Sequence, residues 1–226
     1  MDLRQKILLW IGVAMFILVA AGTGQMLISA EMHVTQASIE RNLQATNYVS
    51  RIVDLYVLER TTGVEAVTKR PETAQILASK NASGIARLVD EITGINQRVD
   101  IITTIGIHDA NCIGIDRDRL TAMNVTGMDF SGRDYCKGVT STNAKYVSSA
   151  FVSLENSSYS LGVSMPVKES NGRMVGYFLT LVDVDKLTGY LANAAGLYDR
   201  IIILDRYGNE MVDTSCLLYT SDAADE

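Results

Sequence analysis

The residue types that most often carry catalysis are scarce in this chain. It has only two histidines, His33 and His108, and three cysteines, at positions 112, 136 and 216. No two cysteines have the Cys-x-x-Cys spacing, and the carboxylates show no catalytic spacing. Metal centres and nucleophilic triads therefore lack their usual residues, and we expect neither a metal nor a cofactor in this segment.

The densest group of charged and aromatic side chains lies at residues 128–139, with the sequence MDFSGRDYCKGV. The elements around it have the pattern of β-strands. Residues 101–108 predict one strand, and residues 109–114 predict a turn into a second. Residues 144–153, 159–167 and 173–184 predict three more, with a hairpin turn at 170–172. Short turns between adjacent strands indicate an antiparallel sheet, and thus an α+β fold with about five strands. Asp185 is expected to cap a following helix that ends near residue 195.

Two helices are expected before the sheet. Residues 31–70 contain no proline, and their apolar side chains recur at spacings of three and four residues, at Val49, Ile52, Val53, Tyr56, Val57, Val64 and Val67. A helix of about 40 residues without internal caps is typical of a stalk or a dimer helix. Pro71 ends it, and residues 72–99 predict a second helix that Gly84 and Gly94 weaken.

Residues 7–30 form an apolar run without a charged side chain. A helix rises about 1.5 Å per residue, so about 20 residues cross the hydrocarbon core of a bilayer. Arg4 and Lys6 precede the run, and the next basic residue after it is Arg41. This asymmetry predicts a cytoplasmic N-terminus and an extracytoplasmic body. The alternative is a cleaved signal peptide that ends near residues 19–21.

Composition limits the remaining choices. The 226 residues are 47% hydrophobic, enough for a membrane helix and one sizeable domain. The net charge is −6 and no basic stripe is present, so nucleic acid is not an expected partner. Residues 216–226 break the strand pattern and resemble the translation of a transposase-type sequencing adapter. We exclude them from fold reasoning and expect the natural protein to continue after residue 215. The alternative is a natural acidic tail.

The apolar run, the long helix and the five strands, taken in their order along the chain, resemble the double Cache sensor domains of bacterial and archaeal chemoreceptors and sensor kinases. The resemblance covers residues 31–215 and is carried by the segments 129–135, 164–167 and 176–187. It implies a PAS-like antiparallel sheet on a long N-terminal helix. It also implies four parts: a membrane helix at 1–30, a membrane-distal module at 31–196, the start of a truncated membrane-proximal module at 197–215, and the excluded tail at 216–226.

The resemblance further implies a ligand pocket in the distal module, with Arg133 and Tyr135 pointing into it. The planar fork of an arginine matches the two oxygens of a carboxylate, and a tyrosine adds a hydroxyl donor. The alternative is that Arg133 forms an ion pair with Asp129 or Asp134 while Tyr135 belongs to the core.

The resemblance also implies that the third strand lines the same pocket. By alternation, one face of this strand carries Val147, Ser149, Phe151 and Ser153, and the other carries Tyr146, Ser148 and Ala150. The resemblance favours the face of Ser149 and Phe151. Phe151 could equally be a core residue. Amino-acid-binding members of the family carry an Arg-x-Trp-Tyr pattern and an aspartate in the fifth strand. This chain departs from both, since Leu181 stands at the aspartate position; Asp183, two residues later, could reach the pocket rim. These departures imply a small mono- or dicarboxylate ligand rather than a zwitterionic amino acid.

Cys112 and Cys136 could form a disulfide, because an extracytoplasmic body permits one. Otherwise Cys136 is simply a small buried residue.

Two classes of function follow. The first is the extracytoplasmic ligand-sensing region of a receptor that crosses the cell membrane once in this segment, binds a small organic acid and forms a homodimer through the helix at 31–70. The second is a membrane-anchored structural or adhesive domain without a small-molecule ligand. No enzyme activity is expected of this segment, whereas a kinase or cyclase could follow it in the full-length protein.

We predict that residues 7–30 are an uncleaved membrane anchor and that the chain from residue 31 onward lies outside the cytoplasm. Alkaline phosphatase fused after residue 215 should be active, and a fluorescent protein that folds only in the cytoplasm should be dark at the same position. Cytoplasmic fluorescence would contradict this topology, and a mature chain that starts near residue 22 would identify a signal peptide.

Overall fold

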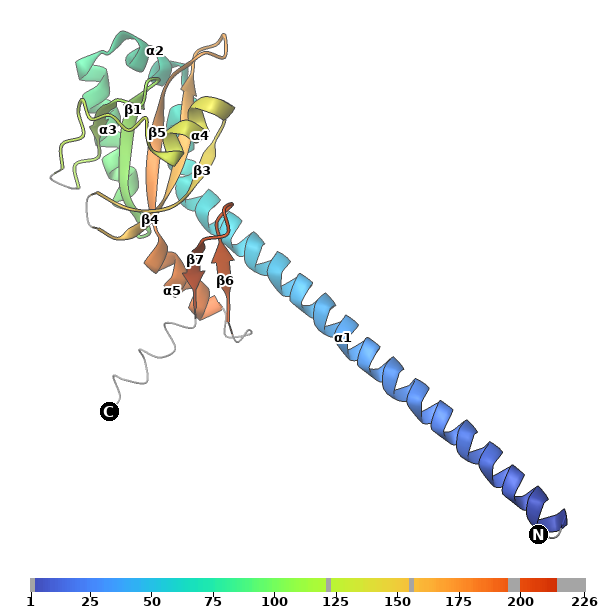
Figure 1. Cartoon of the computed structure of the whole chain (residues 1–226). Helices are drawn as coiled ribbons and strands as arrows, with labels where there is room; N and C mark the ends of the chain where they lie inside the picture. Colours follow the sequence, from blue (N-terminus) through green and yellow to red (C-terminus); the bar gives the residue numbers. More distant parts are fainter. Residues whose placement is uncertain (1–2, 121–122, 155–156, 195–199, 215–226) are drawn as a thin grey trace, which may run out of the picture. The chain divides into compact units, whose positions relative to one another are not determined.

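The computed structural model describes residues 3–120, 123–154, 157–194 and 200–214. At residues 3–14, 16–31, 58 and 194 it describes the backbone only. The structure is α+β, with a long N-terminal helix, a five-stranded antiparallel sheet and a two-stranded sheet, which confirms the predicted fold class (Figure 1). The chain divides after Asp54 into two compact units, and each is described by itself below.

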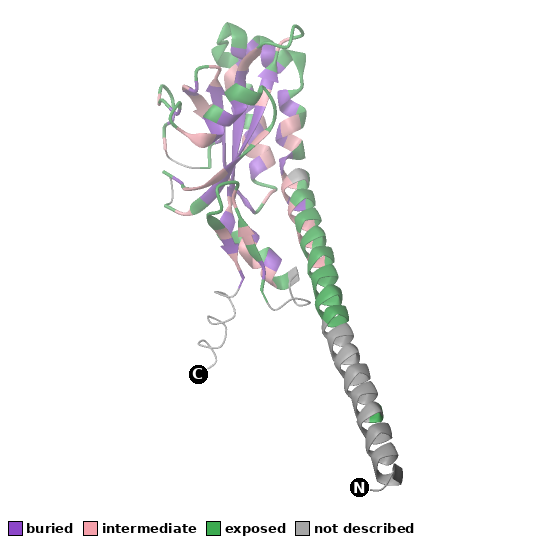
Figure 2. Ribbon diagram, turned by 45° about the vertical axis from the view of Figure 1, so that its right-hand side comes forward, coloured by how far each residue is buried: buried purple, intermediate pink, exposed green. Residues whose placement is uncertain are grey.

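Helix α1 spans Leu3–Thr68, so the helix expected at residues 31–70 is present and begins earlier in the chain. In the first unit, the side chains from Met32 onward are mostly exposed (Figure 2). They include the large apolar side chains Met32, Val34, Ile39, Leu43 and Tyr48, of which Val34 is 70% exposed. Of these, Met32, Ile39 and Leu43 follow one another at spacings of seven and four residues and share one face of the helix, which indicates a surface that another element covers.

The predicted membrane helix at 7–30 lies, except for Met15, outside the side chains that the structure describes. Among the residues that are described, no helix is both long enough and apolar enough to cross a bilayer.

The second unit is built on the five-stranded sheet, whose strand order is β2-β1-β5-β4-β3. Every neighbouring pair is antiparallel. The strands are β1 (Ile102–Asp109), β2 (Gly114–Arg117), β3 (Tyr146–Val152), β4 (Tyr159–Lys168) and β5 (Met174–Asp183). The β4–β5 hairpin turns at the predicted place, where Gly172 has a φ of +83° that a glycine adopts without strain. The five predicted strands are therefore all confirmed.

The sheet is covered on both faces. Helices α2 (Pro71–Ser79) and α3 (Ala82–Asn96) contact β1, β4 and β5. Helix α4 (Asp134–Thr142) contacts β3 and β4 and packs over an apolar cluster that includes Tyr177, Leu179 and Leu181 (Figure 1). Because side chains alternate along a strand, the residues of β5 between these three point to the opposite face, where Phe178 and Val182 are fully buried. Both faces of β5 thus belong to the core.

The prediction of one helix over residues 72–99 is wrong, because α2 and α3 are separate helices. Lys80 ends α2 in the left-handed conformation, with φ 50°. Asn81 then caps α3, and its side chain accepts a hydrogen bond from the backbone N–H of Gly84 at 2.9 Å. A Cβ on Gly84 would lie 2.8 Å from the side chain of Ile76, so the two helices approach closely at this glycine.

Helix α5 (Val184–Ala194) follows β5 and contacts the second sheet, which consists of β6 (Ile202–Leu204) and β7 (Glu210–Asp213). The turn between β6 and β7 is closed by Asp205, whose carboxylate accepts hydrogen bonds from the backbone N–H groups of Tyr207 and Asn209 at 2.8 Å each. This hairpin occupies the place expected for the start of a second module, whose boundaries stay a prediction. Residues 197–199 and 215–226 lie outside the described residues.

The face of the C-terminal part of α1 that carries Tyr56, Val64 and Val67 is not available to a partner chain, since these residues are buried within the second unit. The proposed dimer therefore depends on the exposed residues of the first unit. Single cysteines at Ile39 and Leu43, one helical turn apart, should cross-link between two copies in membranes when Cys216 is replaced by serine. Cysteine at Val64, which is fully buried, is the matched control and should not react. If no position along residues 34–53 cross-links between copies, the dimer prediction fails.

Candidate functional site

A cavity of about 50 Å³ lies beside the apolar cluster that α4 covers. Its walls come from β1, β2, β5, the end of β3, the segment before α4, and α4 itself. The lining residues are Thr104, Gly106, His108, Arg117, Met123, Val125, Phe130, Arg133, Tyr135, Phe151, Ser153, Leu154, Leu179 and Leu181. About 10–15 Å³ of such volume holds one water molecule, so the cavity has room for several water molecules or a small ligand in their place.

Arg133 lines this cavity, and its contact with a ligand stays a prediction. It is the N-cap residue of α4, with extended backbone angles of φ −80° and ψ 144°. Its side chain is half-buried, and its guanidinium carbon lies 5.7 Å from the centre of the Phe151 ring. No carboxylate of a described residue forms an ion pair with it. The guanidinium is therefore positioned by packing, with its hydrogen-bonding edge available to a ligand.

The two carboxylates considered as partners of Arg133 have other contacts. Asp134 accepts a hydrogen bond from the hydroxyl of Tyr146 at 3.0 Å and one from the backbone N–H of Ser149 at 2.9 Å. Asp129 accepts a hydrogen bond from the backbone N–H of Ser131 at 2.8 Å. These hydrogen bonds fasten α4 to β3 and fold the loop before α4.

Tyr135 also lines the cavity, and only 3% of it is exposed. Its ring packs against those of Phe151 and Phe130, with centroid distances of 5.4 and 6.4 Å. Burial raises the pKa of its phenol well above the usual value, so the hydroxyl stays protonated and can donate a hydrogen bond. Tyr135 thus belongs to both the core and the cavity wall.

The residues of the third strand that were expected in a ligand pocket do not all line the cavity. Phe151 and Ser153 line the cavity, whereas Ser149 does not. The pairing of β3 with β4 shifts register between Val147 and Ala150, which is a β-bulge. A bulge breaks the alternation of side chains, so Ser148 is buried and Ser149 is displaced from the face of Phe151.

Asp183 is not among the residues that line the cavity. Its carboxylate accepts hydrogen bonds from the backbone N–H groups of Asp185 and Lys186, at 2.9 and 3.1 Å. Asp183 therefore caps α5, and the expectation that Asp185 is the cap is wrong. Leu181 lines the cavity at the position where amino-acid-binding relatives were expected to carry an aspartate.

Three polar lining residues were missed by the sequence analysis. Thr104 and His108 lie on β1, and Arg117 lies on β2 with only 6% of its surface exposed. The Arg117 guanidinium donates a hydrogen bond to the Thr104 hydroxyl. For the two residues of β1 the sequence did contain a signal. Thr104, Gly106 and His108 alternate with Ile105 and Ile107, so these three residues must share one face of the strand.

Helix α4 is linked to the turn between β1 and β2 by a disulfide between Cys112 and Cys136, whose Cα atoms lie 6.1 Å apart. Cys112 sits in the turn between β1 and β2, and Cys136 in the first turn of α4. The bond thus anchors α4 next to its two cavity residues, Arg133 and Tyr135.

The charged side chains that line the cavity are all basic among the described residues. Two arginines line it, and no acidic side chain does so among the described residues. Burial lowers the pKa of His108 to about 3, so its imidazole is neutral at physiological pH. Within the described part of the chain, no group of three or more His, Cys, Asp or Glu side chains is placed to hold a metal ion. This environment suits a small anion with an apolar body.

Solved structures with the same fold are ligand-binding domains of chemoreceptors. That of the Campylobacter jejuni chemoreceptor Tlp3, in complex with L-valine, has a TM-score of 0.61 and 13% sequence identity, and the match covers 78% of this chain and 69% of that chain. The ligand-binding domain of Mlp24 with asparagine has a TM-score of 0.56 and 13% identity, over 77% of this chain and 70% of that one. That of the Pseudomonas fluorescens chemoreceptor CtaA, in complex with L-isoleucine, has a TM-score of 0.56 and 14% identity, over 74% and 64%.

The chain therefore has the Cache-type fold of these ligand-binding domains, which confirms the resemblance recognised in the sequence. No family model matches the sequence, and no curated protein matches it significantly.

The buried neutral His108 predicts a loss of stability in mild acid. The unfolded chain binds a proton on this histidine near pH 6.5, whereas the folded chain does so only near pH 3. The unfolded state thus binds more protons below pH 6.5, and the stabilisation present above that pH is lost as the pH falls. Urea unfolding of the ligand-free protein should show a loss of about 2 kcal/mol between pH 7.5 and 5.

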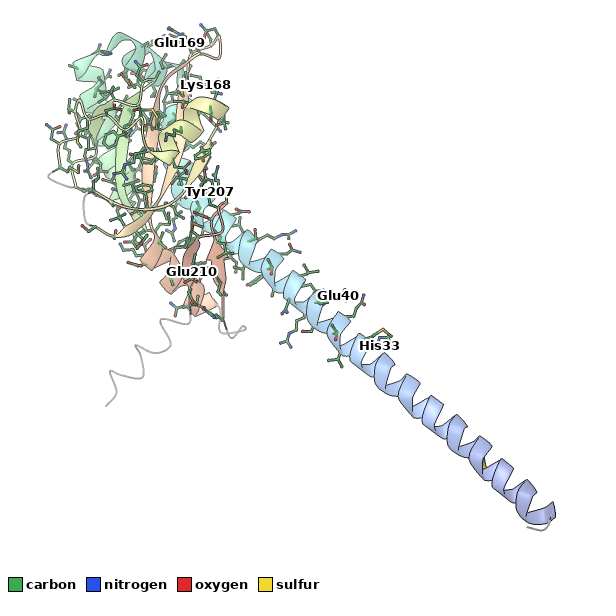
Figure 3. All side chains as sticks on the ribbon, viewed as in Figure 1. His33, Glu40, Lys168, Glu169, Tyr207 and Glu210 are labelled. Atoms are coloured by element: carbon green, nitrogen blue, oxygen red, sulfur yellow. A yellow bond between two sulfur atoms is a disulfide. The ribbon has the colours of Figure 1, made fainter. Side chains whose placement is uncertain are left out.

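His108→Phe should remove this slope, because phenylalanine keeps the ring but does not titrate. The control is His33→Phe, at an exposed position on α1 (Figure 3), which should leave the slope intact. A slope that survives in His108→Phe would contradict the assignment.

Proposed function

We propose that the chain is the ligand-sensing part of a transmembrane signal-transduction receptor and binds a small organic acid in the cavity beneath α4. The observation that carries the proposal is the half-buried Arg133 guanidinium, which lines the cavity without an ion pair to a described carboxylate. A partly desolvated cation requires an anionic or strongly polar partner, and a carboxylate matches its two-pronged geometry.

Other features of the cavity support a carboxylate. Tyr135 keeps its phenolic proton and can donate to a ligand oxygen. The apolar walls supplied by Phe151, Leu179 and Leu181 suit a short carbon chain.

An amino acid is the second candidate, because three solved domains of this fold hold L-valine, asparagine or L-isoleucine. An amino acid also carries an ammonium group, which needs acceptors in a buried site. The described cavity offers Leu181 rather than an acidic side chain on β5. We therefore favour an acid without an amino group.

The rest of the proposed receptor follows from the sequence. The apolar run at 7–30 would anchor the chain in the cell membrane, with the second unit outside the cytoplasm. The exposed apolar side chains of the first unit would pair two copies into a homodimer. The alternative, a membrane-anchored structural or adhesive domain, predicts that no small molecule binds in the cavity.

Arg133→Ala should weaken binding of the acid by about 10- to 150-fold, because hydrogen bonds to charged groups contribute about 1.5–3 kcal/mol and about 1.4 kcal/mol is tenfold. The acid is first found by thermal shift of the purified chain in detergent, with short mono- and dicarboxylates and with L-valine, asparagine and L-isoleucine. Its affinity is then measured by titration calorimetry.

Arg173→Ala is the matched control, since Arg173 is exposed and paired with Glu169 at 2.8 Å on the β4–β5 turn, where Figure 3 labels Glu169. It should bind like the wild type. If only amino acids or neutral compounds raise the melting temperature, or if Arg133→Ala keeps the wild-type affinity, the organic-acid proposal is wrong. If nothing binds, the structural alternative gains support.

A further inference from the structure

His108 presents a buried nitrogen that no described residue satisfies. The side chain lies in the cavity wall, with only 2% of the residue exposed, and its Nδ1 atom has no hydrogen-bond partner among the described residues. Its ring stacks on Tyr177 with centroids 4.7 Å apart and an interplanar angle of 4°. It also meets the Phe130 ring edge-on at 5.0 Å. These two contacts hold the imidazole in place, so it cannot simply turn toward another protein group.

A second unsatisfied polar atom lies next to it. His108 and Tyr177 are directly opposite each other in the pairing of β1 with β5. Tyr177 is fully buried, and its hydroxyl has no hydrogen-bond partner among the described residues. Tyr177 itself does not line the cavity, whereas His108 does. Buried polar groups in native proteins are almost always hydrogen-bonded, so the unsatisfied Nδ1 of His108 indicates that something in the cavity completes it.

The chemistry of His108 defines what it can accept. Burial lowers the pKa of its imidazole to about 3, so the ring is neutral and carries one donor and one acceptor nitrogen. A neutral imidazole binds a hydroxyl, carbonyl or carboxylate oxygen by hydrogen bonding, without adding charge. Space beside the ring is kept free by Gly106, because a Cβ at that position would lie 3.0 Å from His108 Cε1.

The neighbouring wall is polar as well. Thr104 shares the face of His108 on β1, and its hydroxyl accepts a hydrogen bond from Arg117. Arg133 enters the cavity from another element, the N-terminus of α4. Polar groups thus reach one small cavity from the strands and from the helix that covers them.

We propose that His108 is a specificity-determining residue that hydrogen-bonds a second oxygen function of the ligand. The ligand would then be a short carboxylic acid that also carries a hydroxyl, carbonyl or second carboxyl group, rather than a simple alkanoic acid. This inference rests on the proposed function, because it assumes that Arg133 holds the first carboxylate.

The test compares two pairs of acids that differ by one oxygen function: lactate with propionate, and succinate with butyrate. Affinities for the full chain in detergent are measured by titration calorimetry. An unsatisfied buried group costs about five- to 150-fold in affinity. At least one oxygenated acid should therefore bind the wild type more tightly than its partner by a factor in this range. If neither does so while some acid binds, the inference is overturned and the proposed function stands.

His108→Phe keeps the ring that packs on Tyr177 and Phe130 but removes both nitrogens. It should reduce the preference for the oxygenated acid to about threefold or less, and it should leave the affinity for the simple acid nearly unchanged. Arg133→Ala should weaken both members of a pair by similar factors. A preference that survives in His108→Phe overturns the inference. A wild type that binds none of the four acids, and none of the mono- and dicarboxylates of the thermal-shift screen, overturns both the inference and the proposed function.

A direct measurement does not depend on a variant. The chain labelled with ¹⁵N-histidine contains only His33 and His108, so the imidazole signals of His108 can be assigned with His108→Phe or, if that variant does not fold, with His33→Phe. The His108 signals should shift when the oxygenated acid is added and stay in place with the simple acid. The His33 signals are the internal control, and equal shifts with both acids would contradict the proposed contact.

Discussion

The antiparallel pairing of β1 with β5 determines which residues of these two strands line the cavity. Its register joins Thr104 to Leu181, Gly106 to Leu179 and His108 to Tyr177. The approach of the two strands is close, since a Cβ on Gly176 would lie 2.4 Å from the carbonyl oxygen of His108. A slip of one residue would turn Thr104, Gly106 and His108 to the opposite face of the sheet and put Ile105 and Ile107 in their place.

The same pairing buries Thr104 and His108, the polar cavity residues of β1. Burying polar groups costs free energy, so their presence here points to a function. β5 is buried on both faces, so the polar groups of β1 that face α4 have no access to bulk water except through the cavity. Apolar side chains at these positions would have extended the core at no such cost. The structure instead keeps a small cavity with two arginines, a threonine and a histidine in its wall.

The helix that closes the cavity is held at several points. The disulfide ties its first turn to the β1–β2 turn, and the Asp134 carboxylate ties its N-terminus to β3. Gly138 lets the helix approach Tyr146, whose ring would clash with a Cβ at that position. On the same ring of Tyr146 lies Arg206 of the β6–β7 turn, with its guanidinium carbon 4.3 Å from the ring centre. Tyr146, which helps to hold α4, thus also contacts the β6–β7 turn.

Much of this fold could be predicted from local patterns. The runs of β-branched residues located all five strands, Pro71 marked the end of α1, and Gly172 marked the β4–β5 hairpin, because each depends on the preferences of a few adjacent residues. The segment 129–135 pointed to Arg133 and Tyr135 through its resemblance to a known family. The sequence by itself thus determined the elements, their order and one half of the candidate site.

Tertiary structure decided the rest. The break between α2 and α3 depends on the close approach of Gly84 to Ile76, and the bulge in β3 coincides with the hydrogen bond from Ser149 to Asp134 on a different element. His108, Thr104 and Arg117 became cavity residues only when the register of three strands placed them on the face that α4 covers. Asp183 became a helix cap rather than a pocket residue because its carboxylate reaches the first N–H groups of α5. Each of these outcomes depends on contacts between residues that are distant in the chain or on the exact end of an element, and local residue preferences do not contain that information.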